Sequence, residues 1–218
     1  MGTHALYGFI YKGRLYLMYC SMDGYLEGLG LNLMRQIKHA VENGLINYWM
    51  SKCEDLNIVT EAGPKPTLEE RTQLRIWTRR SIFDNQAWQG ETEWYWVLSN
   101  TQGSFFEVLK SGYFLAYYNI SSVGITKKRL LKCAGDHDCR YVYIINFDDL
   151  KYEVIWNTGY SNNYKRHRRR YDIYNLPEQF TGGLDIGTVD DIIRYGDCDD
   201  EGNSLGSRKL RCTPLIGG

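Results

Sequence analysis

The segment Ala5–Cys20, ALYGFIY-KG-RLYLMYC, decides the fold of this 218-residue chain. Two apolar, aromatic-rich runs, Ala5–Tyr11 and Arg14–Cys20, flank the dipeptide Lys12-Gly13. Such runs favour β-strands, and the glycine supplies the positive φ that a tight two-residue hairpin needs. The sequence therefore predicts a β-hairpin in the first twenty residues.

An acidic, glycine-rich elbow, Asp23–Gly30 (DGYLEGLG), follows the hairpin and leads into helical patterns. Apolar residues recur at helical spacing from the end of the elbow to the stop signal Asn43-Gly44. Residues 45–56 (LINYWMSKCEDL) predict a second helix, and the capping box Thr67-Leu68-Glu69-Glu70 starts a third that runs to about Arg80. The elbow is thus a polar loop on a rigid base, which favours a functional surface.

The second half of the chain adds more strands. The predicted elements are a short helix near Phe105–Lys110, a strand through Tyr113–Tyr118, and a second hairpin of Arg140–Phe147 and Lys151–Trp156. Together they predict an α+β fold, in which an N-terminal β-hairpin and helices pack on a mainly antiparallel sheet. We expect residues 1–157 to form this α+β core domain and residues 158–218 to form an irregular, charged C-terminal extension, a tail or a lid.

Composition narrows the classes of partner. Lys and Arg together number 26, as do Asp and Glu, so the net charge is zero, which argues against a surface built wholly for nucleic acid or an anionic membrane. No apolar run is long enough to span a bilayer, so no membrane partner is expected. Six scattered cysteines and the lack of a secretory signal pattern favour an intracellular protein, cytoplasmic or alternatively nuclear.

The opening residues Met1-Gly2-Thr3-His4 and the elbow carry a family resemblance. They resemble an uncharacterised family of proteins from large DNA viruses, phages and fungi, which open Met-Gly-Thr-Arg/His and continue with a hairpin and an Asp-x-Tyr-x-x-x-Leu-Gly elbow. Here the elbow pattern is kept at Asp23, Tyr25, Leu29 and Gly30, while Cys20-Ser21 replaces the family's Asn-His and Leu26 its Pro. A later segment, Tyr141–Asp148, is similar to the family's second hairpin. The resemblance implies a viral origin and no particular activity.

The opening block also suggests a hydrolase. In N-terminal-nucleophile enzymes the α-amine of a terminal Thr, Ser or Cys is the base for its own side chain. Thr3 would be the nucleophile and Asp23 a supporting carboxylate, with Cys20 as the other candidate nucleophile. This chemistry requires cleavage after Gly2. The simpler interpretation, which we rank first, is that Thr3 leads into a strand and Asp23 caps a turn.

The segment Cys133–Cys139 (CAGDHDC) holds the densest set of metal-binding side chains. Thiolate and imidazole are ligands that zinc prefers, so Cys133, His137 and Cys139 are candidate ligands. Their spacing matches no zinc ribbon or finger, and a turn that contains a histidine explains the segment more simply. We therefore predict no metal and no cofactor.

The basic block Lys165–Arg170 (KRHRRR) lies among tyrosines. Arginine and lysine cations pair with phosphates, and tyrosine rings stack on bases. The block is therefore a candidate site for single-stranded nucleic acid. The residues that would bind are Lys165, Arg166, Arg168, Arg169 and Arg170. The alternative, which we favour, is a solvated basic strand or loop that pairs in cis with the acidic segment Asp185–Glu201.

The aromatic content carries the functional hypothesis. The chain has 18 Tyr and 6 Trp, residues that suit half-buried contact surfaces because each joins an apolar ring to a polar tip. We therefore expect a non-enzymatic interaction or structural protein, virus-encoded, that binds a protein partner or itself through a Tyr/Trp-rich surface, with Asp23 and Tyr25 as candidate binding residues. The alternatives are the hydrolase that uses the Thr3/Asp23 region and nucleic-acid binding through residues 165–170.

Overall fold

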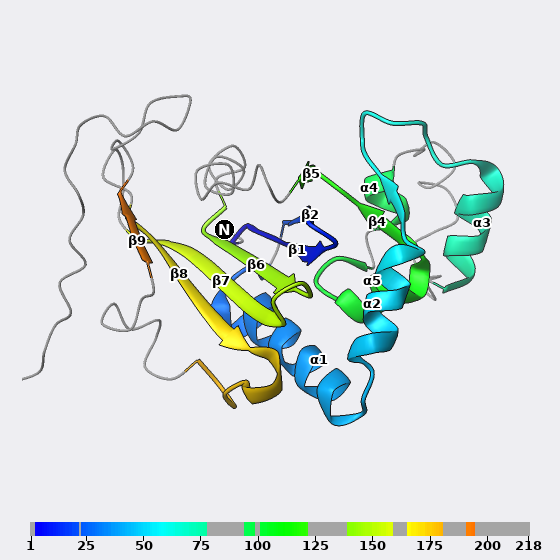
Figure 1. Ribbon diagram of the computed structural model, residues 1–218. Helices are drawn as coiled ribbons and strands as arrows, with labels where there is room; N and C mark the ends of the chain where they lie inside the picture. The colour runs from blue at the N-terminus through cyan, green and yellow to red at the C-terminus, as the bar shows by residue number, and fades with distance from the viewer. Residues whose placement is uncertain are drawn as a thin grey trace, which may run out of the picture.

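A seven-stranded sheet forms the centre of the protein in the computed structural model, which describes residues 3–21, 23–77, 94–98, 101–121, 139–158, 165–180 and 191–194 (Figure 1). The strand order is β5-β2-β1-β6-β7-β8-β9, and all neighbours are antiparallel except β1 and β6. The strands are β1 Ala5–Tyr11, β2 Arg14–Cys20, β5 Tyr118–Ser121, β6 Tyr141–Asn146, β7 Lys151–Thr158, β8 Lys165–Asp172 and β9 Asp191–Arg194. The α+β class with a mainly antiparallel sheet is confirmed.

The predicted hairpin is β1 and β2. Both residues of its turn have positive φ, 47° at Lys12 and 69° at Gly13, as a two-residue hairpin turn requires. The carboxylate of Asp148, in the turn of the second hairpin, accepts hydrogen bonds of 2.8 Å from the backbone N–H groups of both residues. The two hairpins are therefore tied at their turns as well as along the parallel β1–β6 pair.

Helices cover one face of the sheet. A π-helical turn, η1 (Leu26–Gly30), runs into α1 (Leu31–Glu42), followed by α2 (Ile46–Glu54), and α5 (Phe105–Ser111) joins them. Figure 1 shows α1 crossing below β6, β7 and β8. The main hydrophobic core lies between this layer and the sheet. A smaller cluster of apolar side chains, contributed by β1, β2, β6 and β7, is buried on the opposite face.

A smaller unit lies at one side of the main sheet in Figure 1. It consists of the parallel strands β3 (Asn57–Val59) and β4 (Tyr113–Leu115) with α3 (Leu68–Trp77) and α4 (Trp94–Val97). The predicted capping box is confirmed: Glu70 accepts from the Thr67 backbone N–H at 2.7 Å, and Thr67 Oγ1 accepts from the Glu70 N–H at 3.2 Å. The predicted end of α3 at Arg80 lies outside the described residues.

Two expectations differ from the structure. The single strand expected over Tyr113–Tyr118 is two strands. Tyr113–Leu115 (β4) pairs with β3, and the chain then changes partner, so that β5 pairs with β2 from Tyr118. The irregular extension expected after residue 157 instead begins with strand structure: β7 runs to Thr158, and β8 pairs along its whole length with β7. Backbone pairing along a preceding hairpin outweighs the poor strand propensity of a basic run.

Much of the aromatic excess serves the interior. Tyr7, Tyr143 and Tyr152 are fully buried, and the hydroxyl of each donates to a backbone carbonyl, for Tyr7 that of Thr101 at 2.9 Å. Burial raises the pKa of all three hydroxyls well above the ordinary value, so they stay protonated donors. Among the described residues, no helix is long and apolar enough to cross a bilayer.

Candidate functional site

The elbow, Asp23–Gly30, is held by hydrogen bonds to the residue Thr3 before β1 and to Tyr143 on β6. The Gly24 N–H donates to the Thr3 carbonyl at 2.8 Å, and the Gly24 carbonyl accepts from the Tyr143 hydroxyl at 3.0 Å. Asp23 turns the chain with a φ of 55°, and its carbonyl accepts from the Leu29 N–H at 2.9 Å. The elbow is thus a connector between β1, β6 and the helical layer.

Close packing explains the glycines of the elbow. A Cβ on Gly24 would lie 2.7 Å from both the Ala5 Cβ and the Thr3 carbonyl oxygen, and one on Gly30 would lie 2.7 Å from the Tyr143 ring. The Tyr152 hydroxyl also donates to the Gly30 carbonyl at 2.8 Å. These glycines allow close approach of backbone and buried tyrosines.

The candidate catalytic residues are spread over different environments. Asp23 and Tyr25 are exposed, Thr3 is half-buried with its carbonyl bound to Gly24, and Cys20 is buried with 6% of its surface exposed. Neither of the two cavities described below is lined by any of these residues. The hydrolase hypothesis stays a prediction, as do the binding roles of Asp23 and Tyr25.

Replacing Tyr143 with phenylalanine tests the connector role of the elbow. The substitution leaves the Gly24 carbonyl buried without its donor, and we expect the free energy of unfolding to fall by about 1–3 kcal/mol. Urea denaturation followed by circular dichroism measures the change. Tyr141→Phe is the matched control, because no hydrogen bond of its hydroxyl is present among the described residues; equal losses in the two variants would contradict the assignment.

The basic block is divided between the two faces of β8. Side chains alternate along a strand, so Arg168 and Arg170 lie on one face and Arg169 lies on the other. The backbone of Lys165–His167 belongs to β8, but the side chains of these residues, Lys165 and Arg166 among them, lie outside the described part. Among the described side chains of the block, Arg168 and Arg170 are therefore on the opposite face from Arg169, and nucleic-acid binding by the block stays a prediction.

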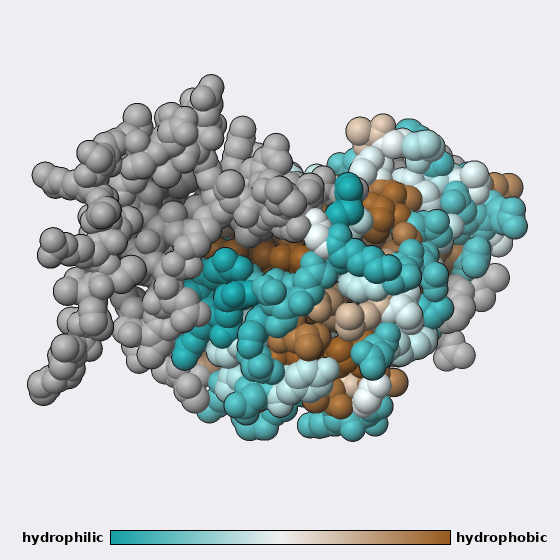
Figure 2. All heavy atoms as spheres, in the orientation of Figure 1, coloured by the Kyte–Doolittle hydropathy of each residue, from teal (hydrophilic) through white to brown (hydrophobic). Residues whose placement is uncertain are grey.

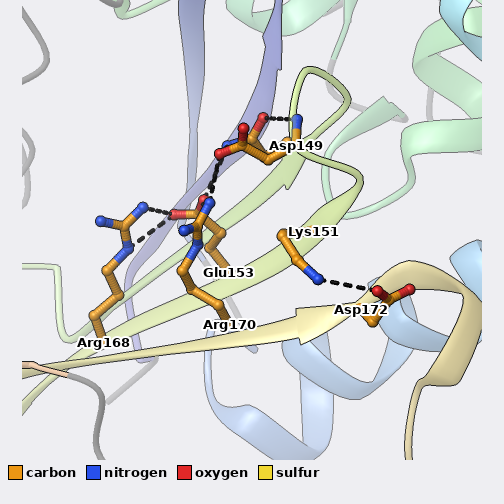
Figure 3. A network of polar contacts seen from close by, with 7 residues as sticks. Asp149, Lys151, Glu153, Arg168, Arg170 and Asp172 are labelled. Atoms are coloured by element: carbon orange, nitrogen blue, oxygen red, sulfur yellow. Dashed lines mark hydrogen bonds and ion pairs between the residues drawn. The ribbon is translucent and has the colours of Figure 1, made fainter.

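Two of these arginines bind a buried carboxylate in Figure 3. The side chain of Glu153, on β7, is fully buried; Arg168 Nε donates to its Oε2 at 2.9 Å, and Arg170 Nε lies 3.2 Å from its Oε1. Asn146 Nδ2 donates to Oε1 at 3.0 Å. Arg170 also pairs with Asp149 at 2.5 Å. The network satisfies Glu153 with nearby cations and commits both arginines to carboxylates of this chain.

The pairing of the block with the acidic segment is seen in the backbone. β9 lies within residues 185–201 and pairs antiparallel with β8, with Asp191 opposite Arg168. This register gives backbone pairing in cis with part of the acidic segment, while the pairing of charges between the two segments stays a prediction. The side chains of β9 lie outside the described part, and the ion pairs of Arg168 and Arg170 that the structure gives are with β7 and its turn.

The proposed metal ligands fall mostly outside the described residues. Cys133 and His137 lie there, and Cys139, which is described, is buried two residues before β6. Among the described residues, no group of three or more His, Cys, Asp or Glu side chains is placed to hold a metal ion.

A groove of about 380 Å³ lies beside β3, at a place that the sequence did not indicate. Its walls are the three residues of β3, the loop 60–67 and the ring pair Trp94–Tyr113, which stack with centroids 5.1 Å apart. Trp94 Nε1 donates to the Pro64 carbonyl at 2.8 Å, which holds the loop against the ring. The aromatic wall of the groove is therefore held in position by contacts within the chain.

Glu70 fixes the polar end of the groove. Hydrogen bonds from the Thr67 N–H and hydroxyl lower the pKa of Glu70 below its ordinary value. The Tyr113 hydroxyl donates to Glu70 at 3.2 Å, and burial, followed by the charge of Glu70, raises the pKa of Tyr113. Tyr113 is thus held in place as a neutral donor.

No family model, no curated protein and no solved structure matches the chain, so the viral kinship stays a prediction and the geometry of the groove carries the functional argument.

Proposed function

We propose that this protein is a non-enzymatic interaction protein that binds an extended segment of a protein partner in the groove beside β3. The observation that carries the proposal is a strand edge that no described strand covers, next to the groove with its stacked Trp94 and Tyr113 rings. An extended peptide that joins a strand edge gains affinity from main-chain hydrogen bonds and specificity from pockets for alternate side chains.

The outer edge of β3 pairs with no strand among the described residues. The Asn57 N–H donates to the Gly112 carbonyl and the Val59 carbonyl accepts from the Ala116 N–H, so both residues direct their backbone groups toward β4. Because successive residues alternate, the N–H and carbonyl of Ile58 are directed to the other edge. No described strand pairs with that edge. Ile58 therefore offers one donor and one acceptor to an incoming strand.

The side chains of the groove resemble those of an interface centre. Trp and Tyr are enriched among the residues that dominate binding energy, and both are held in place here by hydrogen bonds. Figure 2 shows hydrophobic atoms exposed over β3 and surrounded by hydrophilic ones. A hydrophobic centre with a polar rim is the usual anatomy of a binding site for protein.

Replacing Ile58 with proline tests the proposal. Proline removes the outward N–H of Ile58 and leaves the β3–β4 hydrogen bonds of Asn57 and Val59 unchanged, and an edge position tolerates it. The wild-type chain should select extended peptides from a displayed random library. The proline variant should bind the selected peptides about 10-fold more weakly or worse, since it loses a main-chain hydrogen bond and admits the strand poorly.

Ile58→Ala is the matched control, because it shortens the same side chain and keeps the N–H. Fluorescence anisotropy with one selected peptide compares the three proteins. Failure to select any peptide, or equal binding by the proline variant, would contradict the proposal. Size-exclusion chromatography with light scattering examines a second copy as the partner: a dimer that dissociates in the proline variant would identify it.

A further inference from the structure

Arg169 differs from its two neighbours on β8. Arg168 and Arg170 pair with Glu153 and Asp149 on one face of the sheet, whereas Arg169 lies on the other face. Its guanidinium carbon lies 5.2 Å from the centre of the Tyr171 ring. Among the described residues, no carboxylate pairs with it. Within the described part of the chain, the contact that holds the guanidinium of Arg169 is therefore an aromatic ring and not an ion pair.

Arg169 borders a cavity of about 280 Å³ between the end of β8 and the segment after the 3₁₀ turn η5 (Ile173–Asn175). The described residues that line it include the polar residues Asn175 and Gln179 and the apolar residues Leu176, Pro177 and Phe180, and none of them is Asp or Glu. The described lining thus combines one cationic residue, two residues with neutral amides and three apolar residues.

The carboxylates nearest in sequence are engaged elsewhere. Asp172 pairs with Lys151 at 2.9 Å and accepts from the Tyr174 N–H at 3.0 Å, contacts that lower its pKa and keep it ionised. Glu178 pairs with Lys38 on α1. Neither acid is among the described residues that line the cavity.

We propose that this cavity binds a small organic oxyanion, a carboxylate or phosphate group carried on a single planar or apolar body. A guanidinium that lies over a ring without a carboxylate partner still has N–H groups to donate, and those groups match the two oxygens of a carboxylate or phosphate. The Tyr171 ring also restrains Arg169 before binding, which lowers the conformational entropy lost on binding.

The apolar wall and the volume define the rest of the ligand. Phe180 packs edge-on against Tyr171 with ring centres 5.9 Å apart, and Leu176 and Pro177 line the same cavity. The volume lies just below the range of about 300–1,000 Å³ that is usual for ligand pockets. It therefore suits one ring or a short chain, and it is too small for a nucleotide bound in full.

A titration of the full chain followed by nuclear magnetic resonance tests the site. The probes are phenyl phosphate, benzoate and inorganic phosphate. We expect both aromatic probes to bind with shifts at residues 169–180, and inorganic phosphate to bind about 10-fold more weakly because it lacks the apolar body. Arg169→Gln should weaken both aromatic probes at least about 10-fold, as expected for loss of a charged hydrogen-bond donor.

Arg140→Gln is the matched control. Arg140 also lies over a tyrosine ring, 5.8 Å from the centre of Tyr141, and it is not among the residues that line this cavity. Its variant should bind like wild type. The proposal would be overturned by the lack of any shift at about 10 mM probe, by equal binding of the Arg169→Gln variant, by an equal loss in the Arg140→Gln variant, or by inorganic phosphate that binds as tightly as phenyl phosphate.

Discussion

Replacing Glu153 with alanine should lower the free energy of unfolding by about 3–5 kcal/mol, the loss usual when one partner of a buried ion pair is removed. Glu153 is fully buried, and the substitution leaves Arg168, with 19% of its side chain exposed, and Arg170 without their shared carboxylate. Asn146 loses an acceptor as well. Urea denaturation followed by tryptophan fluorescence measures the loss as a lower midpoint at unchanged slope.

Asp149→Ala is the control that distinguishes the loss of a buried carboxylate from the loss of an exposed ion pair. Asp149 pairs with the same Arg170, but 56% of its side chain is exposed, so its removal should cost about 1 kcal/mol or less. A second variant, Glu153→Gln, keeps the size and one acceptor and should fall between the two. Similar losses for Glu153→Ala and Asp149→Ala would contradict the central role of the buried carboxylate.

The substitution Gly8→Ala should cost about 3 kcal/mol or more, at or above the upper end of overpacking losses. Gly8 lies in the middle of β1, opposite Leu17 on β2 and Ile144 on β6. A Cβ there would collide with the backbone carbonyl of Tyr16, and backbone cannot rotate away as a side chain can. Relief requires β1 and β2 to move apart, which weakens the hairpin on which the sheet is built.

Gly44→Ala is the comparison for Gly8. Gly44 has a φ of 65°, but nothing lies within 4 Å of an added Cβ, so the cost is only the backbone strain of about 1–2 kcal/mol. Soluble yield and urea denaturation of both variants measure the difference. A Gly8→Ala variant as stable as the Gly44→Ala variant would show that the β1–β2 contact relaxes more easily than the structure implies.

Elements built from local contacts could be predicted from the sequence. The turn at Lys12-Gly13, the capping box of Thr67 and Glu70 and the hairpin turned near Asp148 each depend on residues a few positions apart. The parallel pairing of β1 with β6 depends on residues more than 130 positions apart, and a single sequence contains no local signal for it. The division of Tyr113–Tyr118 into β4 and β5 also depends on distant partners, β3 for the first strand and β2 for the second.

The candidate sites were harder to predict. In the basic block every residue is polar, so the two-residue alternation that separates Arg169 from Arg168 and Arg170 leaves no hydropathy pattern. One signal was present: Glu153 is a lone carboxylate inside the strand run Tyr152–Trp156, and such a residue needs a cation beside it. Trp94 and Tyr113 meet only through tertiary packing, so the groove had no sequence signature.

The parallel pair β1–β6 has a consequence for synthesis of the protein. β1 can pair with β2 as soon as both leave the ribosome. The other edge of β1 stays unpaired until β6 has been synthesised, about 130 residues later. At about 5–20 residues per second this interval is on the order of 10 s. During that time the hairpin offers an unpaired, apolar strand edge, the kind that templates aggregation. The nascent chain should therefore depend on chaperones until the second hairpin emerges.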